Sequence, residues 1–246
     1  MSDQSEHPNP FRSRRFVLSM VVVGVIALCA VIILISNLTG GRNQADPTTA
    51  PTASTLETTA PTAASDPDPS TCGFKGYEVQ GTVSAAPTAK WELVGTVAAP
   101  TDPVSVGPGV IDASGFRSCF AHTPTGALYA AVNVMALASD RSLTKELANK
   151  LVVRGTGQQA LLKQADDSAA SGTRYQVAGF KIDSYTGATA TVDLAVNFST
   201  GQMLSFPIQL QWLEGDWKVK TTDDGGFTLT PAQLQSLGGY VAWAGA

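Results

Sequence analysis

Residues 192–213 read VDLAVNFSTGQMLSFPIQLQWL and alternate apolar with polar side chains. The apolar positions are Val192, Leu194, Val196 and Phe198, then Leu204, Phe206, Ile208, Leu210 and Trp212. A period of two is typical of strands with one buried face. Ser199-Thr200-Gly201 supplies turn residues between the two runs, so the stretch predicts a β-hairpin. Pro207 has no N–H to donate, which favours an edge position or a bulge.

Two further strands are expected on either side of this hairpin. Tyr175–Ile182 is rich in β-prone residues, and Trp217-Lys218-Val219-Lys220 begins a last strand. Tyr185-Thr186-Gly187 and Glu214-Gly215-Asp216 have the composition of tight connections. The last third of the chain therefore predicts an antiparallel meander of about four strands.

Three helices are expected before the meander. Thr123-Pro124 combines a good N-cap with a proline suited to the first helical position, and apolar residues at helical spacing follow as far as Leu137. Asp140-Arg141-Ser142 interrupts the pattern. Leu143–Val152 and residues 158–170 then predict two shorter helices. Helices followed by a meander predict an α+β cone over residues 123–246, in which a curved sheet wraps the first helix. Trp212 and Trp217 are expected in its core.

Residues 71–122 contain many glycines and prolines between short β-prone pieces, at Tyr77–Val83, Trp91–Val97 and Val104–Val106. We expect an extended lead-in arm on the domain surface, without a core of its own. Cys72 and Cys119 lie in this arm, and in an oxidising compartment they are expected to form a disulfide. Two free thiols are the alternative.

The N-terminal third predicts a single membrane anchor. Residues 1–15 end in a cluster of arginines, and residues 16–35 form an uncharged apolar run of a length that spans a bilayer core. The positive-inside rule places residues 1–15 in the cytoplasm and the rest outside the cell membrane. A cleaved signal peptide and a lipoprotein modified at Cys29 are alternatives, but the run is long for the first and Leu28 does not suit the second.

Residues 36–70 consist mainly of Thr, Pro, Ala and Ser, without an aromatic residue. Such a tract cannot bury enough apolar area to offset its ordering entropy, so we expect a disordered linker. An anchor, a linker and a distal domain predict a chain held near the membrane but free to move away from it.

Composition excludes several function classes. The net charge of −4 argues against direct nucleic-acid binding, and two histidines with three cysteines argue against a zinc cluster. The sequence has no phosphate loop, dinucleotide fingerprint or zinc-protease motif, so no cofactor and no metal are expected. Asp223-Asp224-Gly225 lacks the further acidic positions of a calcium loop and predicts a turn.

No catalytic residue is predicted. His122 is the only histidine after the anchor and precedes the cap of the first helix. It is a candidate for the rim of a pocket, or a residue that bonds the local backbone. Tyr240 and Trp243 follow Gly238-Gly239 and are candidates for an exposed contact patch, or for packing the C-terminal tail on the sheet.

The helix from Pro124, the hairpins and the segment Gly215-Asp216-Trp217-Lys218-Val219 resemble the nuclear-transport-factor-two-like fold. The whole arrangement, with the anchor, the linker, residues 120–127 and residues 237–243, resembles anchored proteins of actinobacterial integrative and conjugative elements. Those proteins are similar to the inner-membrane scaffold subunits of type IV secretion channels. Cys72 and Cys119 depart from that pattern.

This resemblance implies a non-enzymatic scaffold whose partners are other membrane subunits of a conjugation or secretion complex, with membrane lipid around residues 16–35. A homo-oligomer is also expected. The alternative hypothesis is an anchored receptor or enzyme that uses the cone as a ligand pocket. Polar groups converging in a cavity would favour the alternative, and an apolar filled interior would favour the scaffold.

Overall fold

The computed structural model describes residues 65–167 and 174–245, which all lie in the compact unit Thr59–Ala246. The predicted cytoplasmic tail, the transmembrane segment 16–35 and residues 36–64 of the linker lie outside the described residues and stay predictions. Within the described part, no helix combines the length and the apolar character needed to cross a bilayer.

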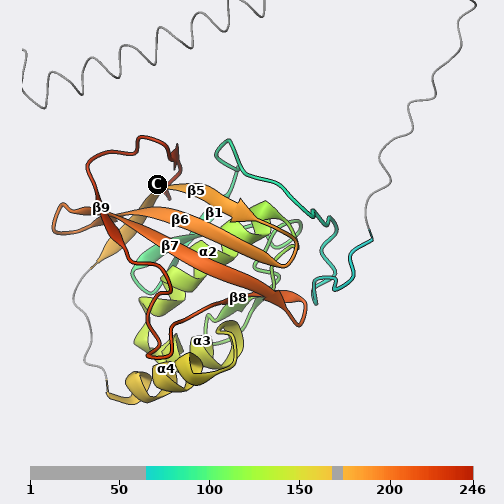
Figure 1. The fold of residues 1–246 in the computed structure, drawn as a ribbon, viewed down its shortest axis with the longest axis horizontal. Coiled ribbons are helices and arrows are strands. Elements are labelled where there is room, and N and C mark those ends of the chain that lie inside the picture. The colour runs from blue at the N-terminus through green and yellow to red at the C-terminus, as the bar shows by residue number, and fades with distance from the viewer. Residues whose placement is uncertain (1–64, 168–173, 246) are drawn as a thin grey trace, which may run out of the picture. The chain divides into compact units, whose positions relative to one another are not determined.

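The described elements form a mixed α+β fold with three α-helices, which confirms the predicted class (Figure 1). The helices are α2 (Pro124–Ala138), the 3₁₀ helix η2 (Arg141–Leu143), α3 (Thr144–Leu151) and α4 (Thr156–Asp167). The strands are β1 (Lys90–Val94), β2 (Val97–Thr101), β3 (Val110–Ile111), β4 (Arg117–Ser118), β5 (Tyr175–Tyr185), β6 (Thr189–Phe198), β7 (Met203–Leu213), β8 (Asp216–Val219), β9 (Ala232–Leu234) and β10 (Val241–Ala242).

The large sheet has the order β10-β5-β6-β7-β8, and β9 pairs with β7 beside β8. Its pairings are all antiparallel, and β5 to β8 are the predicted meander. The sequence did not predict β9 and β10, because pairings of two or three residues carry no periodic signal. Both come from the C-terminal tail, which therefore completes the sheet.

Pro207 lies where the sequence predicts a local edge. On one side of β7, β8 pairs with Leu210–Leu213 and β9 pairs with Met203–Ser205. Pro207 falls in the gap between these two short strands, while β6 pairs with the other side of β7. A proline is tolerated there because it removes no N–H from a continuous ladder.

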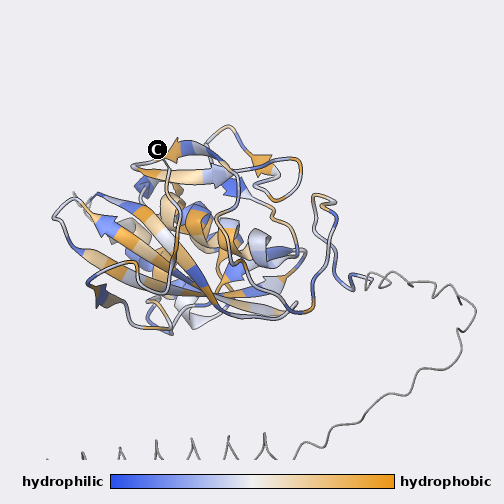
Figure 2. Ribbon diagram, turned by 90° about the horizontal axis from the view of Figure 1, so that it is seen from above, coloured by the Kyte–Doolittle hydropathy of each residue, from blue (hydrophilic) through white to orange (hydrophobic). Residues whose placement is uncertain are grey.

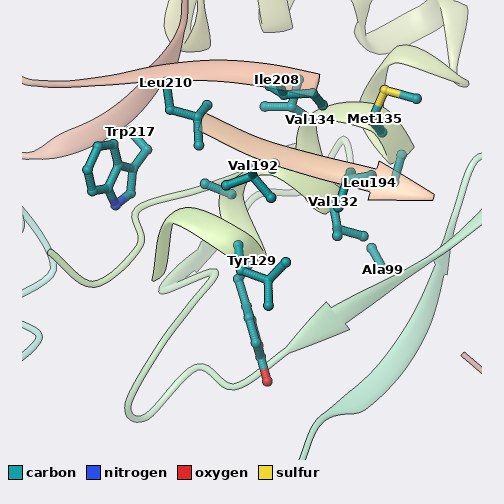
Figure 3. Close-up of a cluster of buried hydrophobic side chains, with 14 of the residues drawn as sticks. Ala99, Tyr129, Val132, Val134, Met135, Val192, Leu194, Ile208, Leu210 and Trp217 are labelled. Carbon is teal, nitrogen blue, oxygen red and sulfur yellow. The ribbon is translucent and has the colours of Figure 1, made fainter. Parts of the chain in front are cut away.

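Helix α2 is the centre of the fold. The Thr123 hydroxyl accepts from the Gly126 N–H at 3.1 Å, and Pro124 occupies the first turn, as the sequence predicts. Thirteen of its 15 residues are buried. Figure 3 shows Val132 and Val134 of α2 among apolar side chains of the strands, and Figure 2 shows apolar residues along α2 and the large sheet.

The lead-in arm departs from the prediction, because much of it belongs to the core. Strands β1 and β2 form a hairpin against α2, and Val94, Val97 and Ala99 are buried there. A helix that is apolar on all sides must be covered on all sides, and one sheet covers only one of them. Of the other predicted pieces, Val104–Val106 forms turns. Tyr77–Val83 is not a strand, although it makes an isolated bridge from Gln80 to Thr186 and the Glu78 N–H donates to the His122 carbonyl at 3.3 Å.

We expect Gly126→Ala to destabilise the domain by about 3 kcal/mol or more. Alanine normally stabilises a helix relative to glycine. Here a Cβ at Gly126 would lie 1.9 Å from the Ala121 carbonyl oxygen, so the chain before the helix would have to move. Urea unfolding of the purified chain measures the change. Thr125→Ala, one residue away, is the control and should alter stability by less than about 1 kcal/mol. A Gly126→Ala chain as stable as the wild type would contradict the close approach.

Candidate functional site

The turn between β7 and β8 brings the start of the described chain against the sheet. Glu214 and Gly215 both have positive φ, at 56° and 73°, as a tight hairpin turn requires. A Cβ at Gly215 would lie 2.8 Å from the Pro69 carbonyl oxygen. The glycine therefore lets residues 69–71 lie directly on the turn, where the Thr71 N–H donates to the Gly215 carbonyl at 3.1 Å.

The Asp216 carboxylate holds the bend that precedes α2. It accepts from the N–H groups of Cys119 at 2.7 Å, Phe120 at 3.0 Å and Trp217 at 2.9 Å. Cys119 has a φ of 70°, a conformation that a non-glycine residue rarely adopts without support. Burial raises the pKa of Asp216 to about 6, against the opposing effect of the three N–H donors. The carboxylate thus fixes a strained backbone at the cost of its own desolvation.

Two more bonds join the same bend to its surroundings. The structure joins Cys72 and Cys119 in the predicted disulfide, with Cα atoms 6.1 Å apart. The Trp217 indole N–H donates to the Ala121 carbonyl at 3.0 Å. The bend is therefore fastened by a carboxylate, an indole and a covalent bond, and His122 follows it directly.

His122 lies in the interior, at 2% exposure. Its Nδ1 faces the Asp66 carboxylate, 2.9 and 3.0 Å from the two oxygens, and its Nε2 bonds the Gly187 carbonyl oxygen. Its ring stacks on Trp212 with centroids 3.8 Å apart, and Tyr77 lies 4.7 Å away. We call the surface formed by His122, Trp212 and Tyr77 the histidine slot.

The histidine slot is built for holding a group and is poorly suited to catalysis. The Gly187 carbonyl only accepts, so Nε2 carries a proton, and the Asp66 carboxylate occupies Nδ1. A general base needs a free nitrogen within reach of a substrate. In this arrangement neither nitrogen is free, and a substrate would have to displace Asp66. The described residues contain no group of three His, Cys, Asp or Glu side chains placed to hold a metal ion.

Sequence reasoning missed the partner of this histidine, because Asp66 lies in the tract assigned to the linker. Residues 65–71, which we call the latch segment, lie against the domain. Besides the Asp66 pair, Trp212 Nε1 donates to the Asp68 carbonyl at 2.7 Å, and the Ser70 hydroxyl donates to the Phe120 carbonyl at 2.9 Å. The one signal in the sequence is the Asp-Pro-Asp-Pro run, which departs from the surrounding Thr/Ala composition.

Trp243 is not an exposed contact residue. It is buried among the rings of Trp91, Tyr129 and Phe180, and its indole N–H donates to the Pro87 carbonyl at 2.9 Å. Trp243 instead packs the C-terminal tail on the domain, which is the alternative given above for this residue.

Tyr240 is half-buried on the outer side of the sheet. Its hydroxyl donates to Asp193 at 2.7 Å, and Lys181 lies over its ring. Asp193 alternates with the core residues of β6, so its side chain points to the outer side of the sheet, where the C-terminal tail covers it. There it is buried and also accepts from the Ser205 hydroxyl at 2.7 Å.

A separate hollow of about 580 Å³ opens to the surface between the tip of the β1–β2 hairpin and the adjoining ends of β5 and β6. Leu93, which is 71% exposed, Tyr175 and Phe198 supply its apolar lining, and Arg174 and Asn197 add polar groups. The Gln176 side chain in its wall is already bonded to the backbone of Thr96 and Ala98. None of the predicted site residues lines this hollow.

Comparison with known proteins adds one family. A family model described as "Domain of unknown function (DUF8175)" matches residues 48–242, more than half of the chain. The chain belongs to the DUF8175 family. No curated protein and no solved structure matches it. The DUF8175 match includes the latch segment and ends in β10, so the family unit contains the histidine slot together with the segment that fills it.

We expect Asp216→Asn to change how stability depends on pH. The folded pKa of about 6 lies above the ordinary value of 3.8, so the folded chain holds this proton more tightly than the unfolded chain. Stability contributed by this carboxyl therefore falls as the pH rises from about 4 to about 6. Asparagine does not titrate, so the wild type should lose stability relative to the variant over that window.

Urea unfolding of both chains between pH 4 and 7 measures this effect. Asp68→Asn, at an exposed position, is the control and should follow the wild-type slope. A constant difference between Asp216→Asn and the wild type across the window would contradict the raised pKa.

Proposed function

We propose that the chain is a non-enzymatic, membrane-tethered scaffold or interaction domain outside the cytoplasm, and a subunit of a conjugation or type IV secretion-like channel. One observation carries the non-enzymatic part of this proposal. The space between the large sheet, α2 and the β1–β2 hairpin is filled with apolar side chains. In a nuclear-transport-factor-two-like cone, this is the space that a ligand would need. Of the buried polar side chains on α2 and β2, Asn133 donates to the Pro100 and Tyr129 carbonyls, whereas its Oδ1 and the Thr101 hydroxyl have no hydrogen-bond partner within the described part of the chain.

The packing of the core supports this conclusion. Large side chains at 0–1% exposure fill it, among them Trp217, Tyr129, Phe116, Phe120 and Phe180. Among the described residues, the hollow beside Leu93 and a second one of about 160 Å³ near the start of α4 are both open to the surface. Neither hollow is lined by His122. A ligand site normally needs a concave space with convergent polar groups.

The location outside the cytoplasm is supported by the disulfide and by the predicted anchor. Structural disulfides persist in oxidising compartments and are rare in the cytosol. The resemblance to conjugative-element proteins supports the assembly, with other membrane subunits and a second copy of this chain as partners. We place the contact face at the hollow beside Leu93. There an exposed leucine next to half-buried Tyr175 and Phe198 offers apolar area to a partner.

The alternative function is a tethered ligand-binding domain. The same hollow favours it, because about 580 Å³ is the size of a small-molecule site. Its openness and its single cationic side chain, Arg174, favour a protein contact over an enclosed ligand. A chain purified from its native membrane with a bound small molecule would favour the alternative.

We expect deletion of the chain to lower conjugative transfer by the element that encodes it, and Leu93→Asp to reproduce the defect. A charge at this position should disrupt an apolar contact while changing stability by no more than about 0.5 kcal/mol, because the side chain is exposed. Mating frequency and crosslinked recovery of channel subunits are the two readouts. Val79→Asp, at a position 52% exposed and outside the hollow, is the matched control. Wild-type transfer by the deletion strain would contradict the proposal.

A further inference from the structure

We propose that the histidine slot is a docking site for an acidic, proline-flanked segment, and that Asp66–Pro69 of the chain itself fills it as a reversible latch. The latch fixes the point at which the linker leaves the domain. Its contacts do not depend on the proposed function; only its use as the attachment of a membrane tether rests on that proposal. In Figure 1 the segment is cyan and lies beside the turn between β7 and β8.

The slot recognises two groups at a fixed spacing. His122 Nδ1 faces the carboxylate of Asp66, and the indole N–H of Trp212 donates to the carbonyl two residues later. The Asp68 N–H donates back to the Asp66 carboxylate at 3.0 Å, which shapes the segment into a turn. An acidic residue followed two positions later by an accepting carbonyl is therefore the pattern that the slot selects.

The prolines reduce the entropic cost of docking. Pro67 and Pro69 fix their own φ angles and restrict the residues before them, Asp66 and Asp68, to extended conformations. A segment with few conformations in the free state loses little entropy when it docks. The same feature distinguishes Asp66–Pro69 from an ordinary linker, whose many conformations would oppose a fixed contact.

The latch is reversible because it buries little apolar area. Ser65, Pro67, Asp68 and Pro69 are exposed, and Asp66 is half-buried. Docking thus depends on a few polar contacts, which contribute roughly 1 kcal/mol each and more where a charge takes part. Opening this segment should cost far less than unfolding the domain. The opening ends at Cys72, because the disulfide holds that residue on the bend at Cys119.

The slot keeps its shape when the segment leaves. His122 lies between the disulfide-bonded bend and α2, its Nε2 stays on the Gly187 carbonyl, and Trp212 is part of β7. Trp217 packs edge-on against both rings. Opening therefore uncovers His122 Nδ1, which faces the Asp66 carboxylate, and the Trp212 indole N–H, which donates to the Asp68 carbonyl, both near the ring of Tyr77.

Hydrogen exchange on the full chain tests the latch with Asp66→Asn and Asp68→Asn. Both substitutions remove one negative charge from the same segment, but no side-chain contact of Asp68 takes part in docking. The reporter is the Thr71 amide, which donates to Gly215. We expect its exchange to accelerate at least about tenfold in Asp66→Asn, equivalent to a loss of about 1.4 kcal/mol, and to stay at the wild-type rate in Asp68→Asn.

Amides of β6 show whether a change is local. Unchanged Thr71 exchange in Asp66→Asn would overturn the latch. Equal acceleration at Thr71 and throughout β6 would also overturn it, because Asp66 would then stabilise the whole domain and not a segment that opens by itself.

Chemical rescue tests the preference for a carboxylate. In Asp66→Gly the carboxylate is absent, and added formate should restore slow exchange at Thr71, whereas chloride at the same ionic strength should not. Rescue by both salts, or by neither, would overturn carboxylate recognition. These measurements need no conjugation partner, so a failed mating assay and a failed latch are distinguishable.

Discussion

The Asp216 carboxylate is the contact on which the rest of this domain depends. It takes three backbone N–H groups out of water and holds the left-handed turn at Cys119. A buried carboxylate with fewer donors would favour its neutral form and bind the bend more weakly. Since the disulfide, His122 and the first turn of α2 all follow from the position of that bend, one side chain at the start of β8 places elements that lie about a hundred residues earlier in the chain.

A second constraint is that α2 has no polar side. A helix apolar all round needs cover on each face, and the large sheet covers only one. The β1–β2 hairpin covers a face of α2 that the large sheet leaves open, so it is part of the core. This is why the arm folds with the domain although it is rich in glycine and proline. The single polar side chain at the helix centre, Asn133, donates to the Pro100 carbonyl of β2 and so ties the two elements together.

Local patterns were sufficient to predict the helices and the meander. Both signals depend only on residues close together in the sequence. They are the alternation over residues 192–213 and the Thr123-Pro124 cap, and the structure contains the strands and the helix that they predict. The contacts of the candidate site are of another kind. Asp66 and His122 are 56 residues apart, and no periodicity connects them. Composition even concealed Asp66, because a tract of Thr, Pro and Ala has the signature of disorder whether or not its last residues dock.

The two ends of the latch segment are attached to the domain with different strengths. At its C-terminal end, a covalent bond joins Cys72 to the bend; at its N-terminal end, a side-chain contact of 2.9 Å joins Asp66 to His122. Force applied through the predicted linker would therefore open the contact between Asp66 and His122 first and stop at the disulfide, leaving the core intact. A domain built in this way can release its first residues without losing its fold. In the proposed membrane-tethered scaffold, the same segment would set both how far the domain reaches and whether the histidine slot is filled.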